Sequence, residues 1–166
     1  MDSFFSLMEF AVAIAGFSGV AIALQARGAV MNELQLFRNK NLITYSLAAA
    51  FASAMPEACV KLGASGPDVW SWSSRIFAVF CCGLIASPFR ARSVMSDEGA
   101  QKLARSIWVM TVGGVFVVLV AQIANTLSVF GEPIAAPIYL GILYLIFLAT
   151  VMYSRMLFDP RNTEDV

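Results

Sequence analysis

A serine framed by glycines, in Gly16-Phe17-Ser18-Gly19, is the first group in the sequence with the potential of a nucleophile. A serine attacks a carbonyl only when a neighbouring base accepts its proton, and that base is most often a histidine. The chain contains no histidine, which excludes Ser–His and Cys–His mechanisms and His-ligated haem or metals. The lysines, at positions 40, 61 and 102, are not expected near Ser18. The sequence therefore predicts no catalytic residues and a protein that is not an enzyme.

The same stretch also fits a helix-packing surface. Small residues recur at every fourth position, the spacing that lets membrane helices approach closely, at Ala11, Ala15, Gly19 and Ala23. Ser18 lies on an adjoining stripe, where its hydroxyl can bond to the backbone of its own helix. Alanines and a serine repeat the pattern within residues 48–54. We therefore expect the first two apolar helices to pack tightly on each other or to meet a second copy.

Part of this stretch resembles the nucleophile motif of rhomboid intramembrane serine proteases, through Gly16, Ser18, Gly19, Ala23 and Leu24. The resemblance is confined to residues 15–24, and the rhomboid mechanism uses a histidine from another helix to accept the serine proton. Because this chain has no histidine, the resemblance does not extend to protease activity.

A longer stretch, residues 9–24 followed by Arg27, is similar to a group of small multi-pass bacterial membrane proteins of uncharacterised function. In that group a Gly-Phe-Ser-Gly first helix precedes a proline in the second helix and a Trp-x-x-Ser near the third. The matching residues here are Pro56, Trp70 or Trp72, and Ser73 or Ser74. The resemblance implies a bacterial origin and no particular activity.

Ionisable and amide side chains lie inside the apolar segments, where an ionisable group costs about 2.5–3.5 kcal/mol on insertion scales. Glu9, Glu57 and Arg75 fall at similar depths, near the same end of their segments. Gln122 and Asn125 reach a similar depth on one face of the fourth segment. We therefore expect a polar layer close to one membrane surface.

Two interpretations of this layer remain open. Glu57 and Lys61 are spaced as neighbours on one helix, and a short turn brings Arg75 to the same height, so the three charges can fix the register of a hairpin. Alternatively, the layer forms an outward-open pocket for an ion, a lipid headgroup or a small solute. Glu9 has no partner in its own helix and is expected at the interface or paired with Arg75. Pro56 predicts a kink in the second helix.

The elements that position these residues are membrane-spanning helices. Of the 166 residues, 59% are hydrophobic and 13% are charged, unlike the balance of a soluble domain. A helix needs roughly 20 apolar residues to cross about 30 Å of hydrocarbon. Such segments occur at residues 4–24, 42–62, 69–89, 107–130 and 134–157. The sequence predicts an all-α bundle of five transmembrane helices in one domain, residues 1–166, with a four-helix version as the alternative.

Basic residues favour one orientation of this bundle. Lys and Arg occur after the first, third and fifth segments, whereas residues 63–68 and 131–133 contain none. The positive-inside rule then places the N-terminus outside and the C-terminus in the cytoplasm. The short connections predict two antiparallel hairpins, the second helix with the third and the fourth with the fifth. Ser96, Asp97 and Glu98 predict a helix start before the fourth segment.

The remaining features predict neither a cofactor nor a nucleic-acid partner. Cys59, Cys81 and Cys82 lie in apolar segments without the spacing of metal ligands, so we expect buried thiols and no metal site. A net charge of zero gives no basic surface for nucleic acid. The inner halves of the helices are mainly aliphatic and aromatic, so one copy offers no continuous polar path across the membrane.

Two functions are compatible with these observations. The first is a non-catalytic subunit of the bacterial inner membrane that self-assembles, or joins a larger membrane complex, through its small-residue faces. The second is an oligomeric ion channel or small-solute transporter that uses the polar layer. The expected partners are the lipid bilayer and either further copies of the chain or another membrane protein.

Overall fold

The chain folds into helices joined by turns. The structure, a computed structural model, describes residues 2–26, 33–94, 109–129 and 131–158, and no strand occurs among them. Its helices are α1 (Asp2–Ala26), α2 (Glu33–Lys61), α3 (Pro67–Val94), the π-helical turn η1 (Val109–Gly113), α6 (Gly114–Thr126) and α7 (Ala136–Phe158). The two ends of the bundle are called here the Asp2 end and the Ala26 end, after the termini of α1.

Five helical segments are long and apolar enough to cross a membrane, which confirms the predicted all-α five-helix fold over the four-helix alternative. They are Ser3–Ala23, Leu36–Lys61, Pro67–Arg90, Val109–Thr126 and Ala136–Arg155. By the length and composition of these helices the chain is a multi-pass membrane protein. The second helix begins at Glu33, earlier than the predicted residue 42. Asn39 and Asn41 therefore lie within α2, where both are buried, and not in a connection.

Some predictions concern residues outside the described ranges. They include the helix start at Ser96, Asp97 and Glu98 and the basic side chains of Arg27, Lys102, Arg105 and Arg161. Residues 107, 108 and 130 of the predicted fourth span also lie outside these ranges.

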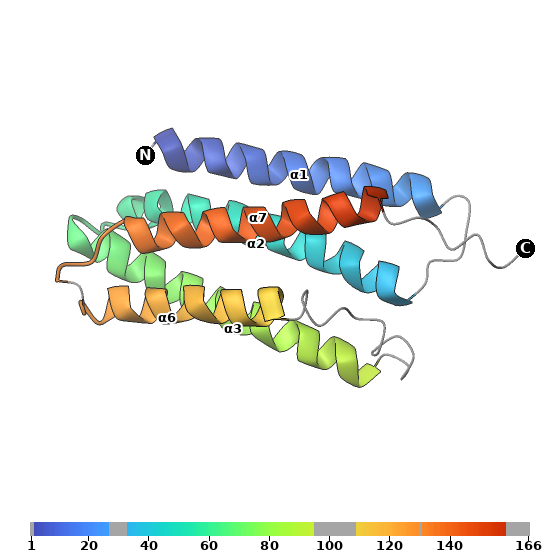
Figure 1. The fold of residues 1–166 in the computed structure, drawn as a ribbon. Helices are drawn as coiled ribbons and strands as arrows, with labels where there is room; N and C mark the ends of the chain where they lie inside the picture. The colour runs from blue at the N-terminus through green and yellow to red at the C-terminus, as the bar shows by residue number, and fades with distance from the viewer. Residues whose placement is uncertain (1, 27–32, 95–108, 130, 159–166) are drawn as a thin grey trace, which may run out of the picture.

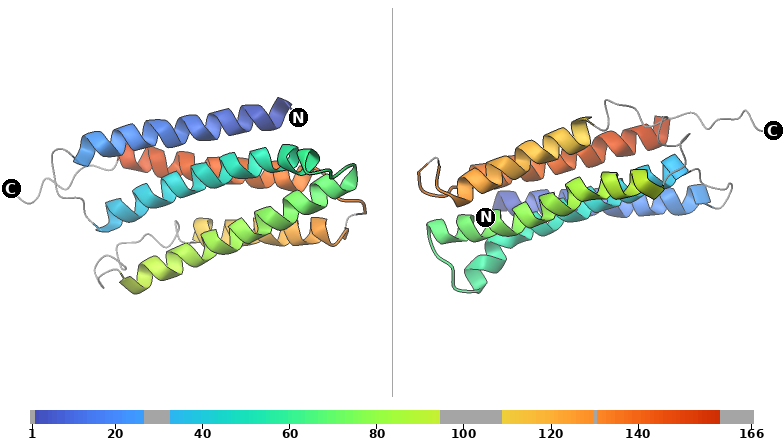
Figure 2. Two further views of the ribbon diagram at one scale, coloured as in Figure 1. Left: turned by 180° about the vertical axis from the view of Figure 1, so that it is seen from behind. Right: turned by 90° about the horizontal axis from the view of Figure 1, so that it is seen from below.

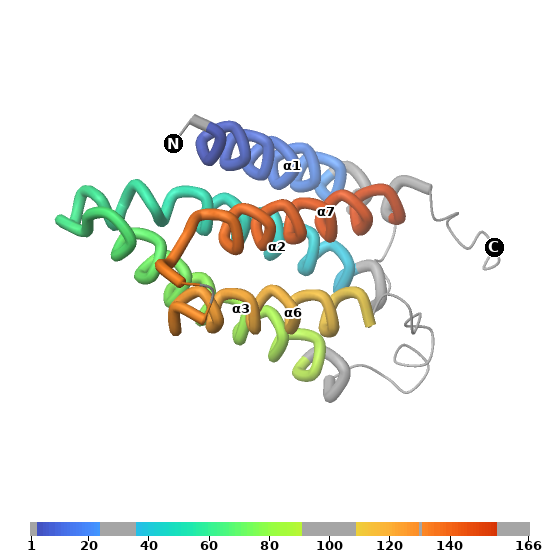
Figure 3. The backbone as a smooth tube through the Cα atoms, turned by 60° about the vertical axis from the view of Figure 1, so that its left-hand side comes forward, coloured from blue at the N-terminus to red at the C-terminus, as the bar shows by residue number. Residues whose placement is uncertain are grey.

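Four of the five spans form a bundle, and α1 lies outside it. Around the bundle the order is α2, α3, α6 and α7, whereas α1 packs mainly on α2 and less on α7 (Figures 1 and 2). Only 11% of the α1 span is buried, against 50% of the α2 span. α3 and α6 occupy the side of the bundle away from α1, as the tube in Figure 3 shows.

The predicted antiparallel hairpins are present. The turns from α2 to α3 and from α6 to α7 both lie at the Asp2 end (Figure 1). The most extensive packing within the four-helix bundle nevertheless joins helices of different hairpins, α2 with α7 and α3 with α6. Short turns thus set which helices run antiparallel, while the side chains set which faces meet.

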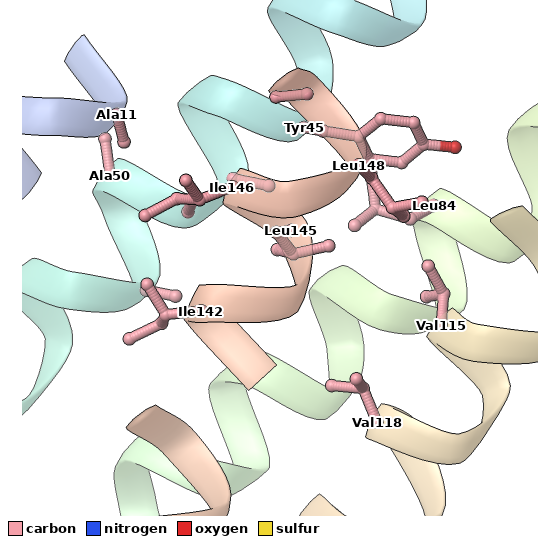
Figure 4. Close-up of a cluster of buried hydrophobic side chains, with 14 of the residues drawn as sticks. Ala11, Tyr45, Ala50, Leu84, Val115, Val118, Ile142, Leu145, Ile146 and Leu148 are labelled. Carbon is pink, nitrogen blue, oxygen red and sulfur yellow. The ribbon is translucent and has the colours of Figure 1, made fainter. Parts of the chain in front are cut away.

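Aliphatic side chains of α7 fill the centre of the bundle. Ile142 and Leu145 are fully buried between the surrounding helices (Figure 4). On the other side of α2, Ala50 lies opposite Ala11 of α1 (Figure 4). Because both side chains are small, the two backbones can approach closely, and α1 packs on α2 about as extensively as α7 does. The predicted tight pairing of the first two helices is confirmed.

The packing face of α1 differs from the predicted stripe. Burial recurs every seventh residue, at Phe4, Ala11 and Ser18. Ala15 and Gly19 are partly exposed and Ala23 is exposed, although both Ala15 and Gly19 flank the buried seam. Four residues advance about 40° around a helix, whereas seven residues return to within about 20° of the starting direction. The four-residue stripe therefore rotates out of the contact with α2 as it approaches the Ala26 end.

Candidate functional site

Asn125 closes the connection between α6 and α7 at the Asp2 end. Its Nδ2 donates to the backbone oxygen of Ile134 at 3.0 Å, and its Oδ1 accepts from the Ile134 N–H at 3.0 Å. The same Nδ2 donates to the Oγ of Ser74 in α3 at 2.8 Å. The Asn125 side chain is 2% exposed. One buried amide therefore links α6, α3 and the segment that leads into α7.

Gln122 lies one turn deeper on the same face of α6. Its Nε2 donates to the backbone oxygen of Pro137 at 2.8 Å, which ties α6 to the first turn of α7. Gly141 makes this approach possible, because a Cβ there would lie 2.6 Å from Phe77 Cε1, 2.9 Å from Val118 Cγ1 and 3.2 Å from the Gln122 amide nitrogen. Gln122 is fully buried, and its Oε1 has no hydrogen-bond partner.

Serines of α3 complete this neutral polar group. Ser73 and Ser74 are both fully buried, and Ser73 donates to the Cys59 sulfur of α2 at 3.6 Å. The sequence prediction included the two amides of α6 but not their serine partner. The signal was present, since Ser71, Ser73 and Ser74 interrupt an otherwise apolar helix. The structure thus brings Gln122 and Asn125 together with residues of α3 and α7, facing inward.

The predicted group of three charges is only partly formed. Lys61 Nζ lies 2.7 Å from Glu57 Oε1, one turn apart on α2, and the Lys61 side chain is 74% exposed. Arg75 does not join them. Its guanidinium lies over the Trp72 ring, 5.0 Å from the ring centroid, on the exposed side of α3. The expectation that Arg75 faces Glu57 across the hairpin is therefore wrong, because one turn of α3 carries Trp72 and Arg75 together to its outer side.

Glu9 points away from the rest of the chain. It lies about 200° around α1 from Ala11, which faces α2. The carboxylate is exposed and has no ion-pair partner among the described residues. Neither Glu9 nor Arg75 therefore shares an inward-facing site with the amides of α6. The polar layer is divided into neutral groups that face the interior and charges that face outward.

The Gly-Phe-Ser-Gly stretch has no nucleophilic geometry. Ser18 is fully buried, and its Oγ donates to the backbone oxygen of Ile14 at 2.6 Å, as predicted for a packing serine. A Cβ at Gly16 or Gly19 would meet no atom within 4 Å. Neither glycine is therefore required for a close contact within the same copy. Phe17 between them is 70% exposed. The outer surface of this part of α1 therefore combines two open glycine positions with the exposed Phe17 ring.

A second set of polar groups, toward the Ala26 end, was missed in the sequence. Tyr45 and Asn41 of α2 are almost completely buried, and the Tyr45 hydroxyl and Asn41 Nδ2 have no hydrogen-bond partner. The Tyr144 hydroxyl donates to the Met110 oxygen of η1 at 2.6 Å, and a Cβ at Gly114 would overlap this phenol. The i,i+4 spacing of Asn41 and Tyr45 was the available signal, but α2 was expected to begin after Asn41.

The described residues contain no group of three or more His, Cys, Asp or Glu side chains that could hold a metal ion. Cys59 and Cys81 are buried as predicted, whereas Cys82 is exposed on the outer side of α3.

No protein-family model, curated protein or solved structure matches this chain. The geometry of its polar groups is therefore the basis for a functional assignment.

Proposed function

We propose that this protein is a non-catalytic membrane subunit that assembles with further copies of itself. The observation that carries the proposal is the outward position of Glu9 and Arg75 on two membrane-spanning helices. A charged side chain inside a span costs about 2.5–3.5 kcal/mol on insertion scales, and such residues are normally paired within protein. Among the residues that the structure describes, Glu9 has no such partner, and a neighbouring subunit would supply one.

The outer surface of α1 supports this proposal. Ala13 and Gly16 follow Glu9 on the exposed side of the helix, and Ala23 is exposed further along. Lipid supplies no hydrophobic drive for association, so membrane helices associate through close packing and polar contacts, both of which small residues favour. The outer side of α1 thus combines exposed small residues with a charge near one end of the helix.

The alternative, a channel or transporter with an outward-facing polar site, needs side chains that are free to meet a solute. The amide of Asn125 already makes three hydrogen bonds, and the amide nitrogen of Gln122 bonds to Pro137. Glu57 is paired with Lys61. These contacts support a structural role for the polar layer.

We also propose that the Ala26 end faces the cytoplasm of a bacterial cell, with the N-terminus outside. Among the described residues, the Ala26 end carries Arg38, Lys40, Arg90 and Arg155, whereas the basic residues toward the Asp2 end are Lys61 and Arg75. Basic residues near the cytoplasmic ends of spans set this orientation.

Self-assembly is tested by co-expressing two copies with different affinity tags and extracting them together with their native lipid. Purification through one tag is expected to recover the other. Ala13→Ile, which adds bulk to the outer face of α1, is expected to reduce that recovery roughly tenfold, equivalent to about 1.4 kcal/mol. Ala136→Ile is the matched control, since Ala136 is also an exposed alanine but lies at the start of α7.

Full recovery of the second tag with Ala13→Ile would show that the α1 face is not involved in assembly. Absence of the second tag with the wild-type chain, together with the mass of a single copy, would contradict self-assembly. If a different membrane protein were recovered in fixed proportion instead of the second tag, the chain would be a subunit of a larger complex and not a self-assembling protein.

A further inference from the structure

Two outer faces of the molecule carry opposite charges and otherwise small or apolar residues. On α1 the exposed residues of this face are Glu9, Ala13, Gly16, Phe17 and Val20, called here the α1 outer face. On α3 they are Trp72, Arg75, Val79, Cys82 and Gly83, called here the α3 outer face. α2 and α7 lie between α1 and α3, so the two outer faces point in different directions (Figures 1 and 3).

Positions on the two faces can be compared along the length of the bundle. The rings of Phe4 in α1 and Trp70 in α3 stack with centroids 6.0 Å apart, so these residues lie at the same level of the bundle. Both helices run from the Asp2 end toward the Ala26 end (Figure 1). Glu9 and Arg75 follow Phe4 and Trp70 by the same number of residues, so an equal rise along each helix brings the two charges to similar heights.

The same offset matches the rest of the two faces. Gly16 is level with Cys82, and Phe17 is level with Gly83. A Cβ at Gly16 or Gly83 would meet no atom within 4 Å, and Phe17 is 70% exposed. A large side chain on one face is therefore level with an open glycine on the other.

We propose that neighbouring copies associate head to tail, with the α1 outer face of one copy against the α3 outer face of the next and Glu9 paired with Arg75. This inference rests on the proposed self-assembly and specifies its contact. Copies inserted in the same orientation keep these two helices parallel and at the same depth, so the height match within one copy becomes a match between copies. The Arg75 guanidinium can stay stacked on Trp72 while its N–H groups donate to the carboxylate.

A second copy fits this contact better than a symmetric pairing of two α1 faces. In a symmetric pair, Glu9 would approach the Glu9 of the other copy, and Arg75 would stay on an open face. The head-to-tail contact pairs opposite charges and leaves an unused face at each end, so association continues beyond two copies.

The native cysteine of the α3 outer face allows a direct test. Cys82 is exposed, whereas Cys59 and Cys81 are buried. In Gly16→Cys, the new thiol of one copy would lie level with Cys82 of the next. Mild oxidation of this full-length variant in native lipid, with copper phenanthroline as the oxidant, is expected to give a ladder of covalent dimers, trimers and larger species. The same variant with Cys82→Ser is expected to give no ladder.

Two results would overturn the head-to-tail contact while leaving self-assembly intact. The first is equal cross-linking of Gly16→Cys with and without Cys82→Ser, which would indicate a symmetric contact between α1 helices. The second is no cross-linking of either Gly16→Cys or the level pair Ala13→Cys with Val79→Cys, although tagged copies still copurify. If copies do not copurify at all, the proposed function fails as well.

Charge reversal tests the Glu9–Arg75 pair itself. In the Gly16→Cys background, Glu9→Arg and Arg75→Glu are each expected to reduce the yield of the ladder roughly tenfold. The double variant, Glu9→Arg with Arg75→Glu, is expected to recover most of the yield because it restores opposite charges. If the double variant gave no more ladder than the two single variants, with its helical content unchanged, the Glu9–Arg75 pairing would be excluded.

Discussion

The inward polar group at the Asp2 end and the outward charges of α1 and α3 lie at similar depth but differ in what completes them. Asn125 finds Ser74 and the Ile134 backbone within its own chain, and Gln122 finds Pro137. Glu9 finds no ion-pair partner in the part of its chain that the structure describes. Polar atoms in a membrane need partners, since lipid offers none. The inward group therefore serves the fold of one copy, and the outward charges are suited to contacts between copies.

The largest effect on this comparison is expected from Asn125→Leu. The substitution leaves the N–H and carbonyl of Ile134 and the Ser74 hydroxyl without this partner, so the free energy of unfolding should fall by about 2–4 kcal/mol. Reversible unfolding in mixed micelles, followed by circular dichroism, measures the change. Thr126→Val is the control on the next residue, because Thr126 Oγ1 is buried without a hydrogen bond and its loss should cost nothing. Equal effects of the two substitutions would show that the amide contacts do not stabilise the fold.

The next largest effect is expected at the close approach of α6 and α7. Gly141→Ala places a methyl group against the Phe77 ring and Val118, so we expect a loss of about 1–3 kcal/mol in the free energy of unfolding. This loss would occur although alanine is favoured over glycine in a helix by about 1 kcal/mol. Gly19→Ala is the control, since a Cβ there meets no atom within 4 Å and the change should stabilise α1 slightly. Stabilisation by both substitutions would contradict the packing around Gly141.

A smaller effect, and of a different kind, is expected from Glu9→Gln. Because Glu9 makes no ion pair with the described part of its own copy, the unfolding of one copy should not change. Association between copies should weaken about tenfold, or about 1.4 kcal/mol, when one partner of the proposed pair loses its charge. Energy transfer between labelled copies, measured while the protein is diluted into excess lipid, reports this association. A drop in unfolding stability without a change in association would place Glu9 with the inward group instead.

The smallest effect is expected from Glu57→Gln. Glu57 pairs with Lys61 one turn along α2, and the Lys61 side chain is mostly exposed. Such pairs contribute about 0.3–0.5 kcal/mol, so neither unfolding nor association should change by more than about 0.5 kcal/mol. The same two assays used for Glu9→Gln measure both quantities. A loss of association as large as that of Glu9→Gln would mean that this pair also lies in a contact between copies.

The number of spans and the hairpin partners could be predicted from the sequence, because length, hydropathy and short turns act locally. The pairing of α3 with α6 could not, since it depends on how four helices share one core. The face of α1 that contacts α2 was only partly predictable, because a four-residue spacing and a seven-residue spacing share Ala11 and then diverge around the helix.

The polar residues of the candidate site and their depths could be predicted from the sequence, but not whether their side chains face inward or outward. The depths of Glu9, Arg75 and Asn125 follow from their distance along each span. Whether a side chain faces a neighbour depends on the rotation of the helix, which no single segment determines. Tyr45 was missed for a related reason, because the polar residues that precede it suggested a connection although α2 runs through them.

The most direct test of the division between inward and outward polar groups is the number of copies in native lipid particles, measured by mass. We expect more than one copy of the wild-type chain per particle, one copy with Glu9→Arg, and multiple copies again when Glu9→Arg is combined with Arg75→Glu. A single copy of the wild-type chain at every ratio of protein to lipid would contradict the role of the outward charges in assembly.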